Sequence, residues 1–143
     1  MDRLRYDGHS ALHLAALQGS EELVHSLLKL KADVMSQTST NGANPSSSAA
    51  LLAAGSGHVN VLEALVEGRI GFKTTVSILS NPNSNGETPA YQAAEGGHAN
   101  VLRYLWQQKA DLERPSLRGA TPLYIAAQNN KVRAIHLLLV AQS

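Results

Sequence analysis

The chain has 143 residues, a length that predicts one domain with a buried core of its own. It contains no cysteine, which excludes disulfides, thiolate metal sites and cysteine nucleophiles. The 12 Lys and Arg residues and the 11 Asp and Glu residues give a formal net charge of +1, and no basic cluster predicts binding to nucleic acid.

The N-terminal segment, residues 1–7, is charged and is followed by no apolar stretch, so no secretory signal is expected. The longest strictly apolar run is residues 49–54, whereas a membrane span needs about 20 such residues. We therefore expect a soluble protein without membrane insertion, and we take the cytoplasm as the default location.

One pattern recurs four times along the chain. Its centre is an Ala-Ala pair at 15–16, 53–54, 93–94 and 126–127. A small hydroxyl residue stands five positions before each pair, and Gly or Asn stands three positions after it. These flanking residues are Ser10, Ser48, Thr88 and Thr121 on one side, and Gly19, Gly57, Gly97 and Asn130 on the other. Such self-similarity is typical of stacked repeat proteins.

Each copy of the pattern predicts a short helix, a tight turn and a second helix. Ser and Thr are good helix N-caps, and Pro89 and Pro122 suit the first helical position. Gly, or failing that Asn, ends a helix in the left-handed conformation. The second helices carry apolar residues at helical spacing, including Leu23, Val24, Leu27, Leu28, Val101, Leu102, Leu105, Val132, Ile135, Leu138 and Leu139. We expect the aromatic residues Tyr104 and Trp106 to pack in the core.

These units resemble the ankyrin repeat family. The segments that carry the resemblance are SALHLAA at 10–16, TPAYQAA at 88–94 and TPLYIAA at 121–127. Gly57-His58 and Gly97-His98 resemble the family's inter-helix Gly-His, and Asp7-Gly8, Asn85-Gly86 and Arg118-Gly119 resemble its hairpin tips. The rival tetratricopeptide repeat is rejected because its aromatic and glycine positions are absent.

The resemblance implies an all-α fold, an ankyrin-repeat solenoid of stacked helix-turn-helix units with projecting β-hairpin loops. We expect a single ankyrin-repeat domain over residues 1–143. Its repeats would cover approximately 5–37, 43–72, 83–115 and 116–143, with insertions at approximately 38–47 and 69–84. We expect the first insertion to form a flexible polar loop tip. The second is too apolar for a free loop, and its β-branched stretch at 73–79 predicts a short strand pair that folds back over the repeats or contacts a partner.

No group of side chains predicts catalysis, a metal site or a cofactor site. Ser10 and His13 would suit a Ser-His dyad, but capping explains Ser10 better and no oxyanion-hole motif is present. The resemblance implies that His13 ties adjacent hairpins together. His58 and His98 have no third ligand recurring beside them, and the glycine clusters lack the Gly-Lys-Ser/Thr of a phosphate loop. We expect no enzymatic activity, no cofactor and no metal.

The resemblance implies a protein-protein interaction module, a scaffold or adaptor that binds a partner protein or peptide through its concave face and loop tips. Small residues at 55, 56 and 96 would keep the groove shallow. Glu87 and Glu95 near Arg118 predict a groove of mixed sign. The candidate partner-binding residues, at positions that the ankyrin family uses, are His9, Leu17, Gln18, Ser56, Glu87, Glu95, Arg118, Gln128 and Asn129.

Other hypotheses stay open. The last unit ends on an apolar run at 137–140 and lacks the Ala-Asp loop seen at 32–33 and 110–111. This ending favours one of two alternatives. The repeats are the substrate-targeting segment of a larger enzyme or effector, such as a ubiquitin ligase, a kinase or a host-directed effector, or they self-associate through the apolar C-terminal end. A third hypothesis is a hydrolase that depends on His13.

Overall fold

The computed structural model describes residues 11–35, 37–38, 46–67 and 72–142. Within these ranges the chain forms nine α-helices and no β-strand, and one isolated antiparallel bridge joins Gln37 to Ser48. The all-α prediction is therefore confirmed. The helices are α1 (Ala11–Gln18), α2 (Glu21–Lys29), α3 (Ala49–Ser56), α4 (Val59–Val66), α5 (Phe72–Ser80), α6 (Pro89–Gly96), α7 (Ala99–Gln107), α8 (Pro122–Gln128) and α9 (Val132–Gln142).

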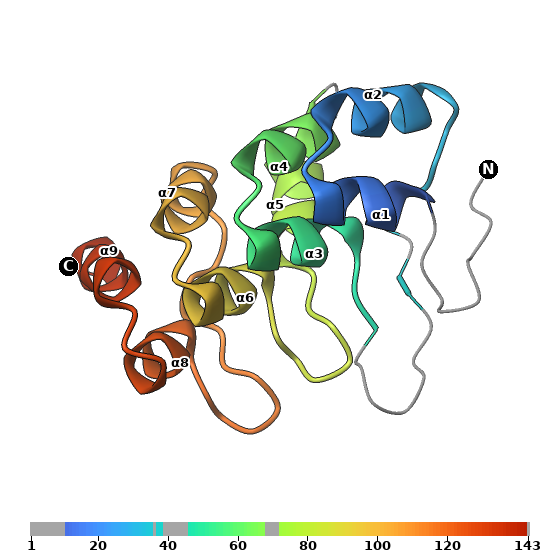
Figure 1. Ribbon diagram of the computed structural model, residues 1–143. Helices are drawn as coiled ribbons and strands as arrows, with labels where there is room; N and C mark the ends of the chain where they lie inside the picture. The colour runs from blue at the N-terminus through green and yellow to red at the C-terminus, as the bar shows by residue number, and fades with distance from the viewer. Residues whose placement is uncertain (1–10, 36, 39–45, 68–71, 143) are drawn as a thin grey trace.

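Eight of these helices form four helix pairs that stack in single file (Figure 1). The first helices of the pairs, α1, α3, α6 and α8, each contact the next and form one layer. The second helices, α2, α4, α7 and α9, form the other layer. The loops that lead into α6 and α8 project beyond the layer of first helices (Figure 1). This arrangement is the predicted solenoid of stacked helix-turn-helix units.

The helix ends follow the sequence signals. The hydroxyls of Ser48, Thr88 and Thr121 each accept a hydrogen bond from the main-chain N–H three residues further on. The first helices are followed by residues of positive φ, at Gly19, Gly57, Gly97 and Asn130. The predicted cap Ser10 and the predicted tip at residues 7–8 lie outside the described residues. Capping and left-handed termination therefore delimit the short helices where the structure describes them.

The alanine pairs lie where neighbouring units meet. Both alanines at 15–16, 53–54 and 93–94 are completely buried, as is Ala126. Because alanine has almost no side chain, first helices can pack closely against one another there. Leucines and valines of the second helices, such as Leu62 and Leu102, complete one continuous buried cluster. No helix pair encloses this core alone.

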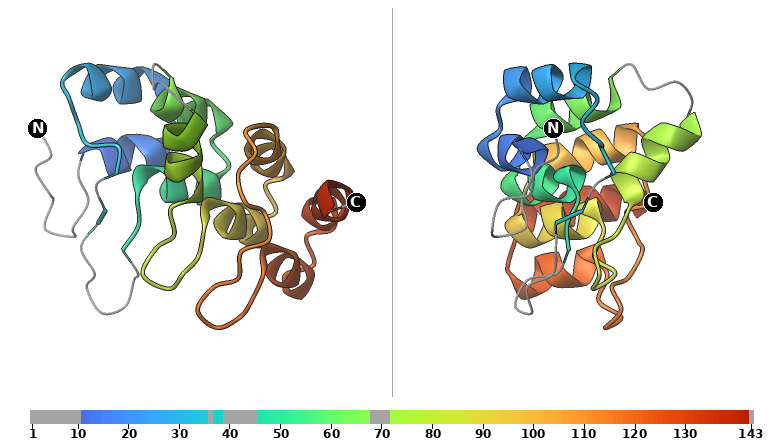
Figure 2. Two further views of the ribbon diagram at one scale, coloured as in Figure 1. Left: turned by 180° about the vertical axis from the view of Figure 1, so that it is seen from behind. Right: turned by 90° about the vertical axis from the view of Figure 1, so that its right-hand side faces the viewer.

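Within the second insertion, residues 72–80 form helix α5, and the strand pair predicted for residues 73–79 is wrong. Helix α5 contacts α4 and α6, and Figure 2 shows it on the outside of the stack, crossing the direction of its neighbours. Among the side chains of α5 that the structure describes, Ile78 and Leu79 are buried, the latter 1% exposed. Strand preference of β-branched residues is weak and depends on context, so burial against two helices outweighs it. The expectation that this segment folds back over the repeats is confirmed.

The prediction that Trp106 packs in the core is also wrong, because this residue is 43% exposed. The buried face of α7 consists of Val101, Leu102 and Leu105. Since successive helical residues are rotated by about 100°, Trp106 points to the flank of that face. Tyr104 is half-buried, and burial, followed by the negative charge of Glu63, raises its pKa to about 12.

Other apolar residues of the second helices also face solvent. Val24 and Leu27 of α2 are buried, but Leu23 beside them is exposed. In α9, Ala134 and Leu138 form the buried face. The exposed residues of this helix include Val132, Leu139 and Val140. The helical spacing therefore predicts the helices correctly, but it also assigns to the buried face apolar residues that the structure leaves exposed.

Candidate functional site

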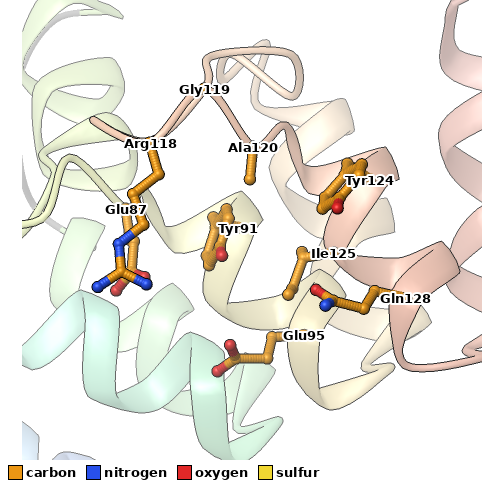
Figure 3. A pocket seen from close by; sticks show the side chains of 9 residues that line it. All are labelled: Glu87, Tyr91, Glu95, Arg118, Gly119, Ala120, Tyr124, Ile125 and Gln128. Carbon is orange, nitrogen blue, oxygen red and sulfur yellow. The ribbon is translucent and has the colours of Figure 1, made fainter.

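A pocket of about 620 Å³ opens between α6, α8 and the loop that precedes α8 (Figure 3). It lies on the layer of first helices, where the loops project. Its position follows from the stacking, because α6 and α8 are the first helices of consecutive units. The lining residues are Glu87, Tyr91, Glu95, Arg118, Gly119, Ala120, Tyr124, Ile125 and Gln128.

Two tyrosines form the aromatic part of the pocket. Each stands three residues after a capping threonine, so Tyr91 and Tyr124 occupy the same place in consecutive units. Tyr91 is 6% exposed and Tyr124 is 59% exposed. Burial raises the pKa of Tyr91, and the negative charges of Glu87 and Glu95 raise it further. Tyr91 is therefore a neutral hydroxyl at neutral pH, able to donate and to accept hydrogen bonds.

The acidic residue Glu87 is held by a small polar network. Its Oε1 atom accepts hydrogen bonds from Asn83 Nδ2 at 2.9 Å and from Gln92 Nε2 at 3.2 Å. Asn83 is buried, and its Oδ1 atom accepts from the main-chain N–H groups of Asn85 and Glu87. Glu87 is thus positioned by protein donors and presents a fixed negative charge to the pocket.

The second acidic residue, Glu95, differs from Glu87 in having no such support. Its carboxylate has no hydrogen-bond or ion-pair partner among the residues that the structure describes. Partial burial raises the pKa of Glu95, and the negative charge of Glu87 raises it further. Of the two carboxylates in the pocket, Glu95 is therefore the one without a partner in the described part of the chain.

Hydrogen bonds within and between the loop tips position the main chain around Arg118, whose own N–H donates to Ser116 Oγ at 3.3 Å. Within the tips, Asn83 N–H donates to Glu87 O and Ser116 N–H donates to Ala120 O, at 2.9 and 2.8 Å. Leu117 N–H donates to Asn85 O at 2.9 Å and so joins one tip to the next. Gly86 and Gly119 have positive φ, as the predicted tips at 85–86 and 118–119 require.

Adjacent units are also fastened at the ends of the first helices. The Nε2 atom of His58 donates to Leu17 O at 3.1 Å, and that of His98 donates to Gly55 O at 2.9 Å. At the next interface Asn129 Nδ2 donates to Glu95 O at 3.2 Å. The predicted inter-helix Gly-His pairs therefore connect units through main-chain carbonyls.

These observations agree with comparisons to known proteins. A family model for ankyrin repeats matches residues 12–113 and 50–143. The chain belongs to the ankyrin repeat family. The Arabidopsis thaliana protein named "Putative E3 ubiquitin-protein ligase XBAT31" is 27% identical over 148 aligned residues, which cover 94% of this chain and 30% of that protein. The mouse (Mus musculus) ankyrin repeat domain-containing protein 37 is 33% identical over 70 residues, 49% of this chain and 44% of that protein. This chain spans less than half the length of either relative.

The ankyrin stack brings four of the predicted partner-binding residues into one pocket, namely Glu87, Glu95, Arg118 and Gln128. Leu17, Gln18 and Ser56 lie at the C-terminal ends of α1 and α3, outside this pocket. The side chain of Asn129 is engaged by the Glu95 carbonyl. The candidate His9 lies outside the described residues.

The pocket residues that were not among the predicted partner-binding residues are Tyr91, Gly119, Ala120, Tyr124 and Ile125. A signal was available for the tyrosines, since both follow a Thr-Pro pair at the same distance in the repeat. The absence of a side chain at Gly96 also has a cause other than the depth of the groove. A Cβ atom there would lie 2.5 Å from His98 Nε2, so the histidine ring occupies that space.

Two further observations concern metal binding and membrane crossing. Over the described ranges, no three His, Asp or Glu side chains are grouped so that they could hold a metal ion. In the same ranges no helix has the length and apolar character that crossing a membrane demands.

Proposed function

We propose that this ankyrin domain is a protein-interaction module that binds a partner protein or peptide through its concave face and loop tips. The observation that carries the proposal is the pocket between α6 and α8, where side chains from two units and one loop tip converge. We propose a scaffold or adaptor role for this surface.

The composition of the pocket suits protein recognition. Tyrosine and arginine are enriched among residues that dominate interface energies, and Tyr91, Tyr124 and Arg118 supply both types. The hydrogen-bonded tips and the bonds between units order the main chain that carries these side chains. Preorganisation lowers the entropy cost of association, so a rigid groove binds more tightly than a mobile one.

Charge reversal within the pocket tests the proposal. In a Glu95→Arg/Arg118→Glu variant the net charge is unchanged, but each reversed charge now faces a group of the same sign on the partner. We expect affinity capture from a lysate to lose proteins that the unaltered chain retains. The matched control is Glu22→Arg/Arg103→Glu, which reverses exposed charges on the second helices α2 and α7. Identical capture by all three folded proteins would refute groove binding.

A second candidate function is recognition of substrates on behalf of a larger enzyme. It is favoured by the alignment to XBAT31, which covers nearly all of this chain but only 30% of that protein. Here the ankyrin pocket would hold the protein to be modified. Sequencing the transcript around this segment tests the idea. A reading frame that continues into a catalytic domain supports it, and a frame confined to the repeats contradicts it.

A further inference from the structure

We propose that the pocket between α6 and α8 receives an arginine side chain of the partner, with its guanidinium against the exposed Tyr124 ring and paired with the Glu95 carboxylate. This inference rests on the proposed function and specifies the chemistry of the bound group. It follows from the charge, the aromatic lining and the hydrogen-bonding groups of the pocket.

The charge of the lining selects a cation. The pocket contains the carboxylates of Glu87 and Glu95 and the guanidinium of Arg118 as its charged groups. Glu87 already accepts two hydrogen bonds from neighbouring amides, whereas Glu95 has no partner in the described part of the chain. Glu95 is exposed, so its carboxylate is accessible to a cationic ligand, and a charge-assisted hydrogen bond to such a ligand is stronger than one to a neutral donor. Two carboxylates against one guanidinium give the lining a net negative charge, which favours a cationic ligand over an anionic one.

The aromatic lining selects a flat cation. Figure 3 shows the Tyr91 and Tyr124 side chains on either side of Ile125, with Glu95 and Gln128 at one edge of the pocket. A guanidinium is planar, stacks on aromatic rings and is less strongly hydrated than an ammonium. Its donors also fork, so one group can reach a carboxylate and an amide oxygen together. Glu95 and Gln128 offer these two acceptors, which favours arginine over lysine.

A chemical-shift titration of the full 143-residue chain tests the inference. The probes are the capped tripeptides Gly-Arg-Gly, Gly-Lys-Gly and Gly-citrulline-Gly. Citrulline keeps the shape of arginine but has no charge. We expect the arginine probe to shift the amide resonances of Tyr91, Glu95 and Ile125, with the lysine probe weaker and the citrulline probe without effect.

Variants identify the carboxylate that is used. We expect Glu95→Gln to weaken arginine-probe binding about fivefold, the range of one exposed cation–aromatic or ion-pair contact. The control Glu22→Gln removes the same charge from the exposed surface of α2 and leaves binding unchanged. Equal binding of the arginine and citrulline probes, equal binding of the arginine and lysine probes, or unaltered binding to Glu95→Gln would each overturn the inference.

Failure of this inference is distinct from failure of the proposed function. If charge reversal at Glu95 and Arg118 abolishes capture of partners while the three tripeptides bind alike, the groove binds partners and the arginine assignment is wrong. If the charge reversal leaves capture unchanged, the proposed function itself is wrong.

Discussion

The side-chain amide of Asn129 donates a hydrogen bond to the main-chain carbonyl of Glu95, at 3.2 Å. In the preceding units His98 makes the equivalent bond to Gly55, and His58 makes it to Leu17. The same carbonyl position, two residues before the left-handed residue, is therefore fastened at three successive interfaces. Because Glu95 is also a pocket residue, the bond from Asn129 helps to place its main chain.

Removing the imidazole of His98 should loosen the interface between the second and third units. His98→Ala leaves the Gly55 carbonyl without its donor and opens space beside Gly57 and Gly96. We expect a loss of about 1–3 kcal/mol in the free energy of unfolding, measured in urea by circular dichroism. The control His136→Ala lies on the exposed side of α9 and should change stability by less than about 0.5 kcal/mol. Equal effects of the two substitutions would contradict this role.

Two helical glycines should respond in opposite ways to alanine. A Cβ at Gly96 would lie 2.5 Å from His98 Nε2, whereas one at Gly55 meets Gln92 Oε1 at 3.5 Å, an ordinary contact. We expect Gly96→Ala to destabilise the fold by about 1–3 kcal/mol and Gly55→Ala to stabilise it by up to about 1 kcal/mol.

A double-mutant cycle identifies the cause of the Gly96 effect. In a His98→Ala background the obstructing ring is absent, so the cost of Gly96→Ala should largely disappear. Strictly additive unfolding free energies in the double variant would show that the histidine ring is not what requires glycine at this position.

The carboxyl group of Glu95 should make stability depend on pH. Burial raises its pKa above the ordinary value of 4.5, so the folded chain holds this proton to a higher pH than the unfolded chain does. Stability from this group is complete below about pH 4.5 and declines as pH rises through the folded pKa. We expect Glu95→Gln to remove this decline, so that the variant gains stability relative to the unaltered chain as the pH rises above about 4.5. A pH-independent difference between the two, or a carboxyl carbon resonance of Glu95 that titrates at the ordinary pKa, would contradict the expectation.

The inserted helix α5 should contribute to the stability of the whole stack. Leu79 is 1% exposed, and Leu79→Ala should cost about 2–5 kcal/mol, the range for a buried leucine. Leu117→Ala removes the same atoms from a loop tip where the side chain is 80% exposed, and should cost less than about 0.5 kcal/mol. If Leu79→Ala were as mild as Leu117→Ala, α5 would be an appendage and not part of the fold.

Prediction from the sequence was most accurate where the residue type alone determines the local geometry. Capping by Thr88 and Thr121 and left-handed termination at Gly57, Gly97 and Asn130 were predicted and observed. Each depends on local geometry that the residue type alone determines. The inter-unit Gly-His pairs were predicted from the family resemblance, but the carbonyls that accept from His58 and His98 became visible only in the structure.

Prediction was weaker where the outcome depends on what packs against a segment. Residues 73–79 are rich in β-branched side chains, yet contacts with α4 and α6 make this segment a helix. Trp106 lies at helical spacing from the buried residues of α7, but its side chain points to the flank of that face and is exposed. In the pocket, Glu87, Glu95 and Arg118 were chosen by position in the repeat. Tyr91 and Tyr124 were missed because an aromatic residue in a repeat motif is ordinarily part of the core.

Photo-crosslinking from the pocket tests the central claim most directly. A benzophenone amino acid in place of Tyr124 projects from the proposed binding surface, whereas the same group in place of Leu23, which is 41% exposed on α2, projects from the layer of second helices. Irradiation in a cell lysate should give discrete covalent adducts from position 124, absent from position 23 and suppressed by Glu95→Arg/Arg118→Glu. The same adducts from both positions, or none from position 124, would contradict the claim that this face binds the partner.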